Sequence, residues 1–249
     1  MSALVVAAGA AVVAGAALQS ATGFGFALVA APLLFSATDP ERAVGLLIVL
    51  GAEVNLLTLA GERRRPAPLW PDTAYIVAWA LPGALAGVAL LRALDAAALQ
   101  LAVTAGVLAS LVVHRRTRAA EAEGPARVPA WALPAAGLAS GALTTSTTTS
   151  GPPLVLYLLR RAAAPAQARD TLTASFLGLG AIAVLALAAT GTGGAVPQSG
   201  WVVGLAPLVA LGHLAGRPVF ARVARGHYDG VLTAVMLVAV GVGLLTALI

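Results

Sequence analysis

Residues 144–153 read Thr-Thr-Ser-Thr-Thr-Thr-Ser-Gly-Pro-Pro, a run of seven hydroxyl side chains that ends in a helix breaker. Short apolar segments flank this run within residues 129–161. Gly-Pro-Pro interrupts an α-helix, because proline has no backbone N–H and clashes with the preceding turn. A broken helix has unpaired backbone N–H and C=O groups, and these are costly in an apolar medium. Whether water or lipid surrounds this segment is therefore the first question about the fold.

The composition indicates that lipid surrounds most of the chain. Of the 249 residues, 59 % are hydrophobic and only 10 % are charged, and the mean hydropathy is +0.92. A soluble domain carries about 25 % charged residues. The absence of Cys excludes disulfides and thiol chemistry. All fifteen basic residues are Arg, and they cluster between apolar runs without interleaved aromatic residues, so we expect no nucleic-acid partner.

Seven apolar runs have the length of a helix that spans a bilayer, about 20 residues. We expect the first to be a retained membrane helix and not a cleaved leader, because no basic residue precedes it. Two other apolar stretches, 24–37 and 129–161, are too short or too interrupted to span in the ordinary way. The expected spans are residues 3–20, 41–60, 72–91, 95–113, 168–190, 199–217 and 228–248.

The two interrupted stretches occupy the same place in the two halves of the chain. We therefore expect two membrane repeats, residues 1–113 and 129–249, joined by a cytoplasmic linker at 114–128. Each repeat would hold a broken or re-entrant hairpin and three transmembrane helices. The identities at an offset of 125 residues, or slightly more, are Ala17-Leu18 with Ala142-Leu143, Thr22 with Thr147, Leu33-Leu34 with Leu158-Leu159, Pro40 with Pro165, and Gly83-x-x-x-Gly87 with Gly212-x-x-x-Gly216. The paired glycines are expected to be close-packing helix faces.

The arginines predict the topology. Loops on the cytoplasmic side of a membrane are enriched in Arg and Lys. Counting alternate crossings places thirteen of the fifteen Arg on the side of Arg63–Arg65, and only Arg42 and Arg92 on the other. Both termini then lie outside, and the two repeats have opposite orientations. The sequence thus predicts an all-α polytopic protein of the cell membrane, built from two inverted-topology repeats.

The two breaks predict a binding site for a small anion. In transporters with inverted repeats, the substrate binds between the repeats near the midplane, where helices are broken. One short helix is expected to begin after Gly25 and another after Ser150, with both N-termini toward the centre, and helix N-termini attract anions. No Arg or Lys is expected at this depth, so neutral donors would hold the anion and release it. The expected binding residues are Gln19, Ser20, Thr22, Gly23, Phe24 and Gly25 in the first break, and Thr144, Thr145, Ser146, Thr147, Thr148, Thr149, Ser150, Gly151 and Pro152 in the second.

Each of these candidates has a structural alternative. Hydroxyls in apolar helices often bond back to the carbonyl four residues earlier, but for a run of seven beside Gly-Pro-Pro we favour a binding role. Glu53, with Asn55 near it, is a candidate for proton coupling, since a carboxylate within a span is costly; its alternative is a hydrogen bond to a neighbouring helix. His213 and Arg217 are candidates for an inner gate, although an Arg at a helix end is commonly an anchor. We expect no metal site and no cofactor, because no set of His, Asp and Glu has metal-ligand spacing.

Three segments carry a resemblance to a known family. They are Ala14-Gly15-x-x-x-Gln19-Ser20-x-Thr22-Gly23-Phe24-Gly25-Phe26 through Pro32-Leu33-Leu34, its partner Ser140-Gly141 through Ser150-Gly151-Pro152-Pro153-Leu154, and the Gly212-x-x-x-Gly216-Arg217 helix. In these segments, and over essentially its whole length, the chain resembles the TauE/SafE sulfite exporter family of membrane permeases. The resemblance implies movement of sulfite, sulfonates such as sulfoacetate, or related sulfur oxyanions. Many members have Gly-rich tracts in both hairpins, whereas the second is Thr-rich here, which alters the donor set.

Three classes of function are compatible with a membrane chain of this kind. We favour a secondary transporter, an exporter of a small sulfur-containing oxyanion that works by alternating access at the repeat interface. A passive anion channel is the alternative, because hydroxyl-lined unwound segments also line pores. An intramembrane enzyme is disfavoured, because no Ser or Thr has a His or Asp partner at matching depth.

Overall fold

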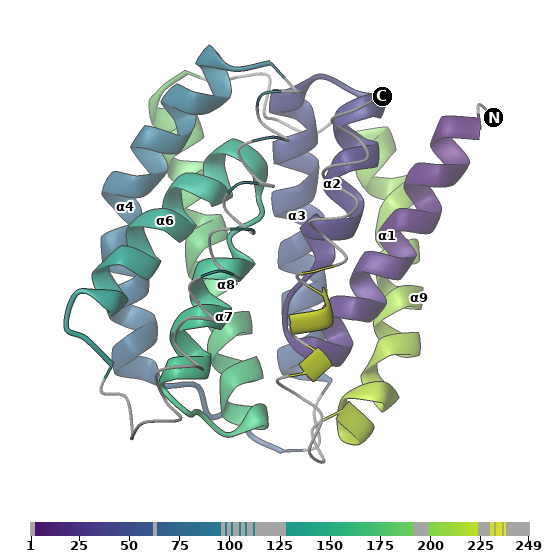
Figure 1. The fold of residues 1–249 in the computed structure, drawn as a ribbon. Coiled ribbons are helices and arrows are strands. Elements are labelled where there is room, and N and C mark those ends of the chain that lie inside the picture. Colours follow the sequence, from purple (N-terminus) through teal and green to yellow (C-terminus); the bar gives the residue numbers. More distant parts are fainter. Residues whose placement is uncertain are drawn as a thin grey trace.

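The computed structural model describes residues 3–61, 64–95, 128–191 and 199–223, with isolated positions between 98 and 112 and between 230 and 237. In this part of the chain every regular element is an α-helix, as the sequence predicted (Figure 1). The expected spans 95–113 and 228–248 and the linker 114–128 lie almost entirely outside the described residues. The helices are α1 (Ala3–Thr22), α2 (Phe26–Ala37), α3 (Pro40–Ala60), α4 (Trp70–Ala93), α6 (Ala132–Thr147), α7 (Gly151–Arg160), α8 (Pro165–Ala189) and α9 (Ser199–Val223).

Five of these helices, α1, α3, α4, α8 and α9, are long and apolar enough to cross a membrane. At 1.5 Å per residue, 21 residues of α3 extend about 32 Å, which matches a hydrocarbon core of about 30 Å. Large apolar side chains point outward along them: Leu185 is 66 % exposed, Val203 72 % and Leu214 63 %. A surface of this kind is stable in lipid and unfavourable in water. The protein is an all-α polytopic membrane protein.

Tight helix pairs connect the two halves of the chain. α1 packs along α9, and α4 packs along α6, whereas α3 and α8 contact each other at the centre. The glycines of α4 and α9 make these close approaches possible. A Cβ at Gly87 would lie 2.2 Å from the carbonyl oxygen of Ala142, and a Cβ at Gly216 would lie 2.0 Å from that of Ala17. The prediction that these glycines form close-packing faces is confirmed.

The two tight pairs use the same contacts in the same register. Gly216 faces Ala17 in α1, and Gly87 faces Ala142 in α6; Ala17 and Ala142 match at the 125-residue offset. One turn earlier, Gly212 faces Val13 and Gly83 faces Leu138. Val13 and Leu138 are again 125 residues apart. Each half thus lays its long helix against the first helix of the other half, so the halves interlock. The inverted-repeat topology remains a prediction, and this shared register is what such a topology would produce.

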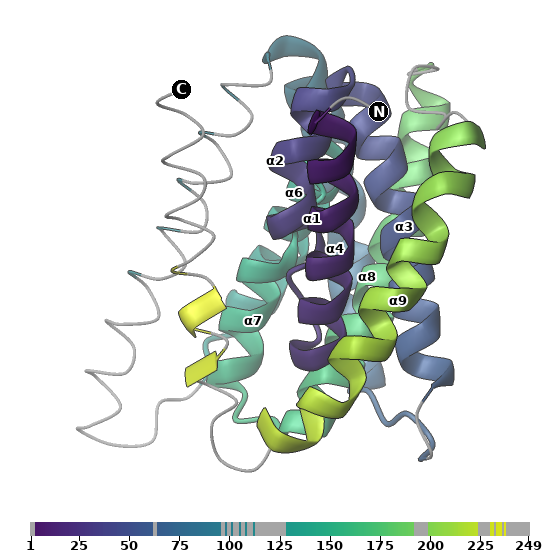
Figure 2. The ribbon, with the colours of Figure 1, turned by 90° about the vertical axis from the view of Figure 1, so that its right-hand side faces the viewer.

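The two short helices lie at opposite ends of the molecule. In both views α2 occupies the upper half and α7 the lower half (Figures 1 and 2). With 12 and 10 residues they extend about 18 Å and about 15 Å, too short to cross a bilayer core. Each follows a break between helices, and the two breaks bring polar backbone groups together within the helical bundle.

Arginines gather at one end of the bundle. The ends of α3, α7 and α9 and the starts of α4 and α8 lie at the lower end of Figure 1, and seven of the nine described Arg belong to or adjoin these segments. Arg42 and Arg92 belong to the opposite ends of α3 and α4. This segregation agrees with the predicted topology, but which end faces the cytoplasm remains a prediction. The seven are Arg64, Arg65, Arg160, Arg161, Arg169, Arg217 and Arg222.

Candidate anion-binding site

The first break separates α1 from α2 at Gly23-Phe24-Gly25. Gly23 has φ +94° and Gly25 has φ +111°, backbone conformations that residues other than glycine rarely adopt. The Thr22 hydroxyl lies 2.7 Å from the carbonyl oxygen of Phe24, to which it donates. Thr22 therefore stabilises the break itself, and the two glycines allow the chain to reverse direction within a few residues.

The second break separates α6 from α7 at Thr148-Thr149-Ser150. Thr148 has φ +58°, and it occupies the position that matches Gly23 at the 125-residue offset. Both halves thus turn through a left-handed residue at the same place, which is glycine in one half and threonine in the other. The two breaks also touch, because a Cβ at Gly151 would lie only 2.7 Å from Cδ2 of Phe24.

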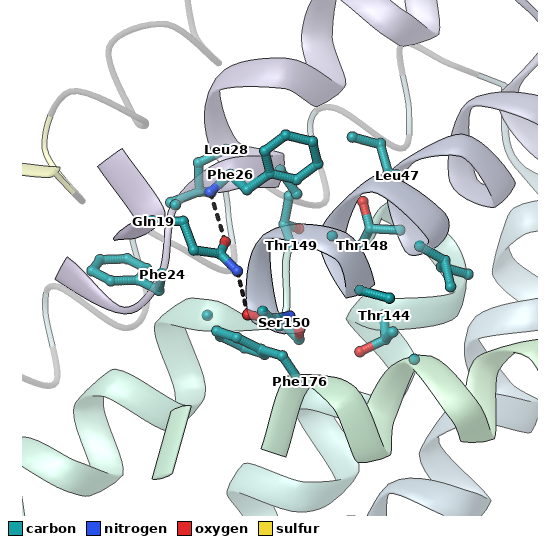
Figure 3. A pocket seen from close by; sticks show the side chains of 18 residues that line it. Gln19, Phe24, Phe26, Leu28, Leu47, Thr144, Thr148, Thr149, Ser150 and Phe176 are labelled. Atoms are coloured by element: carbon teal, nitrogen blue, oxygen red, sulfur yellow. Dashed lines mark hydrogen bonds between the residues drawn. The ribbon is translucent and has the colours of Figure 1, made fainter. Parts of the chain in front are cut away.

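A cavity of about 60 Å³ lies between the breaks (Figure 3). Its walls come from α1, α2, α3, α6, α7 and α8 and from both breaks. Pockets for drug-sized ligands measure at least about 300 Å³, so this one is of a size for a small ion or a few waters. The lining residues are Gln19, Phe24, Gly25, Phe26, Ala27, Leu28, Leu47, Ile48, Gly51, Ala52, Asn55, Thr144, Thr148, Thr149, Ser150, Gly151, Phe176 and Gly180.

The N-terminus of α2 supplies backbone donors to this cavity. The N–H of Phe26 donates to Oε1 of Gln19 at 3.0 Å, while the N–H groups of Ala27 and Leu28 have no partner among the described residues. These donors and the helix dipole make this wall electropositive. α7 contributes less, because Pro152 and Pro153 in its first turn have no N–H to donate. The two N-termini are therefore unequal donors.

Most hydroxyls of the Thr-rich run are bonded to backbone. α6 continues through Thr147, so the carbonyls four residues earlier are available as acceptors. Backbone carbonyls therefore take up the donor protons of Thr144 through Thr147, that of Ala84 in α4 for Thr145 and those of α6 for the others, and a binding role for these four hydroxyls stays a prediction. The bonds are Thr144 to Ser140 O (2.6 Å), Thr145 to Ala84 O (2.8 Å), Ser146 to Ala142 O (2.7 Å) and Thr147 to Leu143 O (3.1 Å).

Two hydroxyls of the run, those of Thr149 and Ser150, do not bond to backbone carbonyls in the described part of the chain. Thr149 lines the cavity and shares a 2.7 Å hydrogen bond with the Thr147 hydroxyl. Ser150 also lines the cavity, is 4 % exposed, and has no side-chain hydrogen bond among the described residues. Ser150 is thus a hydroxyl that is free to donate into the cavity.

The structure brings about half of the predicted binding residues to the cavity. Gln19, Phe24, Gly25, Thr144, Thr148, Thr149, Ser150 and Gly151 line it, whereas Ser20, Thr22, Gly23, Thr145, Ser146, Thr147 and Pro152 do not. Apart from Asn55, which was a coupling or gating candidate, sequence reasoning did not name the cavity walls from α3 and α8. The 125-residue offset was a usable signal for them, because it matches Gly51 with Phe176 and Asn55 with Gly180, and all four are lining residues.

Comparison with known proteins identifies the family. The family model of the sulfite exporter TauE/SafE matches residues 7–244, nearly the whole chain. The chain belongs to this family. The resemblance seen in the sequence is confirmed, and TauE/SafE membership together with the apolar helices makes this a multi-pass membrane transport protein from a family of permeases, not enzymes. No match was found among curated proteins or among solved structures.

One buried cation of this TauE/SafE protein was not expected from the sequence. Arg169 is 1 % exposed; its guanidinium donates to the carbonyl oxygen of Ser20 at 2.6 Å and lies 4.1 Å from the ring centroid of Phe220. A Cβ at Gly23 would lie 3.1 Å from Cα of Arg169, so this arginine is directly beside the first break. The expectation of no Arg at this depth is wrong. The physical reason is that α8 already begins at Pro165, so that Arg169 is part of the helix, and its guanidinium bonds to the backbone of α1.

The coupling and gating candidates separate in the structure. Asn55 lines the cavity, whereas Glu53 is half-buried elsewhere on α3. His213 is 4 % exposed, and its Nδ1 lies 2.8 Å from the Ser20 hydroxyl, next to the first break. Arg217 is exposed on α9. His213 and Arg217 thus differ in environment, and a role in gating remains a prediction for both.

Polar contacts tie the loop after α3 to the start of α8. Both terminal nitrogens of Arg64 contact the carboxylate of Asp170, at 2.7 and 2.8 Å, and the N–H of Ala67 donates to the same carboxylate at 2.7 Å. Nearby, Asp72 accepts a hydrogen bond from the Tyr157 hydroxyl at 2.7 Å. Hydrogen bonding to Asp72 raises the pKa of Arg161. The Arg-rich end of the bundle is therefore cross-linked between the halves.

Proposed function

We propose that this TauE/SafE protein is a secondary transporter that exports a small sulfur-containing oxyanion, such as sulfite or a short organosulfonate. The observation that carries the proposal is the chemistry of the cavity between the breaks. Its described walls present N–H and O–H donors from Ala27, Leu28 and Ser150, and no carboxylate is among the residues that line it. A cavity that offers N–H and O–H donors and has no carboxylate in its walls favours an anion over a cation.

Release requires that binding is not too strong. The side chains that line the cavity are uncharged, and the buried guanidinium of Arg169 is directed at the Ser20 carbonyl and the Phe220 ring and does not line the cavity. Neutral donors hold an anion less strongly than a direct ion pair would. Arg169 adds a positive field near the first break, and the fixed dipoles make the contacts.

Alternating access is the mechanism that this arrangement supports. The glycine contacts make the α1–α9 and α4–α6 pairs rigid units, because there is no free space between their backbones. The described residues that line the cavity come from α1, α2, α3, α6, α7, α8 and the two breaks, and none of them belongs to α4 or α9. We propose that the two units rock relative to each other around the cavity, so that it opens to one side of the membrane at a time.

Flux assays in liposomes test the proposal. Purified protein is reconstituted and loaded with sulfite, sulfate, thiosulfate or a short sulfonate, and counterflow of the labelled anion is measured with and without a proton gradient. Saturable counterflow for a sulfur oxyanion is the expected result. The variant Ser150→Ala should weaken it, whereas Ser36→Ala, at an exposed serine of α2, should not. Anion conductance without counterflow would favour the alternative, a passive channel, and contradict the transporter.

A further inference from the structure

We propose that the Asn55 side-chain amide donates hydrogen bonds to the transported anion, and that Gln19 sets the orientation of this amide. The inference rests on the proposed function, because it assigns a donor within the same cavity. Asn55 is on α3, two residues from the coupling candidate Glu53, and both Asn55 and Gln19 line the cavity.

A backbone group determines how the Gln19 amide is oriented. The N–H of Phe26 can only donate, and it lies 3.0 Å from the Gln19 side chain. The atom of Gln19 that faces Phe26 is therefore the oxygen, Oε1, because an NH₂ group there would place two donors against each other. The other end of the amide, Nε2, is consequently directed away from Phe26 (Figure 3).

The orientation passes from Gln19 to Asn55. Nε2 of Gln19 lies 2.6 Å from the Asn55 side chain, and a donor at this distance requires an acceptor. Oδ1 of Asn55 therefore faces Gln19, and Nδ2 is on the other side of the amide. The order of donors and acceptors follows from the peptide N–H at the start of α2, so the two amides have one consistent arrangement.

The Nδ2 group of Asn55 is available to a ligand. Asn55 is 3 % exposed, and among the described residues its only hydrogen bond is the one from Gln19. Two N–H donors of a buried amide at a cavity wall are costly to leave without an acceptor. The N–H groups of Ala27 and Leu28, also without partners in the described part of the chain, line the same cavity. An oxyanion in this cavity would supply the acceptors that these donors lack.

The second half of the chain has no equivalent of this pair. At the 125-residue offset Gln19 matches Thr144, whose hydroxyl donates to Ser140, and Asn55 matches Gly180, which has no side chain. The cavity is therefore asymmetric: amide and backbone donors belong to the α1–α3 side, and the matching position Gly180 offers no side-chain donor. We infer that the oxygens of the anion face Asn55 and α2.

The test compares variants of Asn55 with a matched control on the same helix. Asn55→Leu removes the donors at similar volume, and Asn55→Asp keeps the shape but replaces donors by a negatively charged acceptor. Thr58→Val is the control, since Thr58 is equally buried at 3 %, bonds to Val54 O and does not line the cavity. The Kd for sulfite is measured by calorimetry on the full chain in detergent, with thermal unfolding as the check of folding.

The loss of a hydrogen bond to a charged group should raise the Kd for sulfite about 10- to 100-fold in Asn55→Leu. Asn55→Asp should abolish detectable binding, and Thr58→Val should stay within about twofold. Gln19→Met leaves Asn55 in place but frees its orientation, and should raise the Kd about 3- to 10-fold. This second site keeps the test decisive if the Asn55 variants do not fold.

Two contrary outcomes are distinguishable. If the wild type binds sulfite and Asn55→Leu binds it equally well, the role of Asn55 is overturned while the transporter proposal stands. Wild-type protein that binds and transports none of sulfite, sulfate, thiosulfate or a short sulfonate would overturn the proposed function, and the inference with it.

Discussion

The close contact between α1 and α9 makes a quantitative prediction for Gly216→Ala. A methyl group at this position would lie 2.0 Å from the carbonyl oxygen of Ala17 and 2.6 Å from its carbonyl carbon, whereas contacts under 3.0 Å essentially do not occur. The helices must therefore separate by about 1 Å. The obstacle is backbone, so no side chain can rotate out of the way.

The expected cost follows from that displacement. A gap of about 1 Å removes up to about half of the dispersion energy of the atoms it separates. Overpacking in a tight core costs about 1–3 kcal/mol, and an obstacle made of backbone places this variant at the upper end, about 3 kcal/mol. Gly204→Ala on the same helix is the matched control. No described atom lies within 4 Å of a Cβ there, so the better helix propensity of Ala should stabilise the protein by about 0.5–1 kcal/mol.

The assay is reversible unfolding in mixed micelles, with the free energy of unfolding extrapolated to zero denaturant for both variants. Gly216→Ala should lower the free energy of unfolding and Gly204→Ala should raise it. The two variants should therefore differ by about 4 kcal/mol in this free energy. Gly87→Ala tests the second contact, where the added methyl would lie 2.1 Å from the Thr145 hydroxyl oxygen and 2.2 Å from the Ala142 carbonyl oxygen. If Gly216→Ala unfolds like Gly204→Ala, the α1–α9 pair is not a rigid unit, and the proposed rocking mechanism loses its basis.

Three further predictions concern the second break, the Arg-rich end and coupling. Thr148→Gly should be more stable than Thr148→Ala by about 1 kcal/mol in the same unfolding assay, because φ is +58° there; the opposite order, normal for a helix, would refute the strain. Asp170→Asn should destabilise by about 1–2 kcal/mol, a reduced figure because Arg64 is 38 % exposed, whereas Asp39→Asn in an exposed pair should cost under about 0.5 kcal/mol; equal losses would show that the loop is not held by Asp170. Glu53→Gln should abolish proton-driven sulfite flux but leave exchange, with Glu41→Gln in the first turn of α3 as the control; driven flux at the wild-type rate would make Glu53 structural.

Much of the site's location was predictable from local sequence signals. The glycines of Gly23-Phe24-Gly25 and the prolines of Ser150-Gly151-Pro152-Pro153 favour helix ends, and α2 and α7 begin at Phe26 and Gly151, where the sequence predicted them. The offset of 125 residues predicted that both breaks occupy the same place in each half, and the structure adds that they turn at the matching positions Gly23 and Thr148. It did not indicate which hydroxyl protons remain free, because that depends on the residue at which α6 ends.

The amino-acid sequence by itself determined the lipid environment, the helical class, the two breaks and the glycine faces, because apolar content and helix breakers act locally or through composition. Only the tertiary structure decided that the hydroxyls of Thr144–Thr147 bond to backbone carbonyls, that Arg169 is buried against the first break, and that Gln19 bonds to Asn55 at the cavity. These features depend on how each helix is rotated about its axis. Successive side chains of a helix point in directions about 100° apart, so this rotation decides which of them face the cavity. An apolar pattern that is hydrophobic all round, as in a membrane helix, leaves that rotation open, and packing against the neighbouring helices sets it.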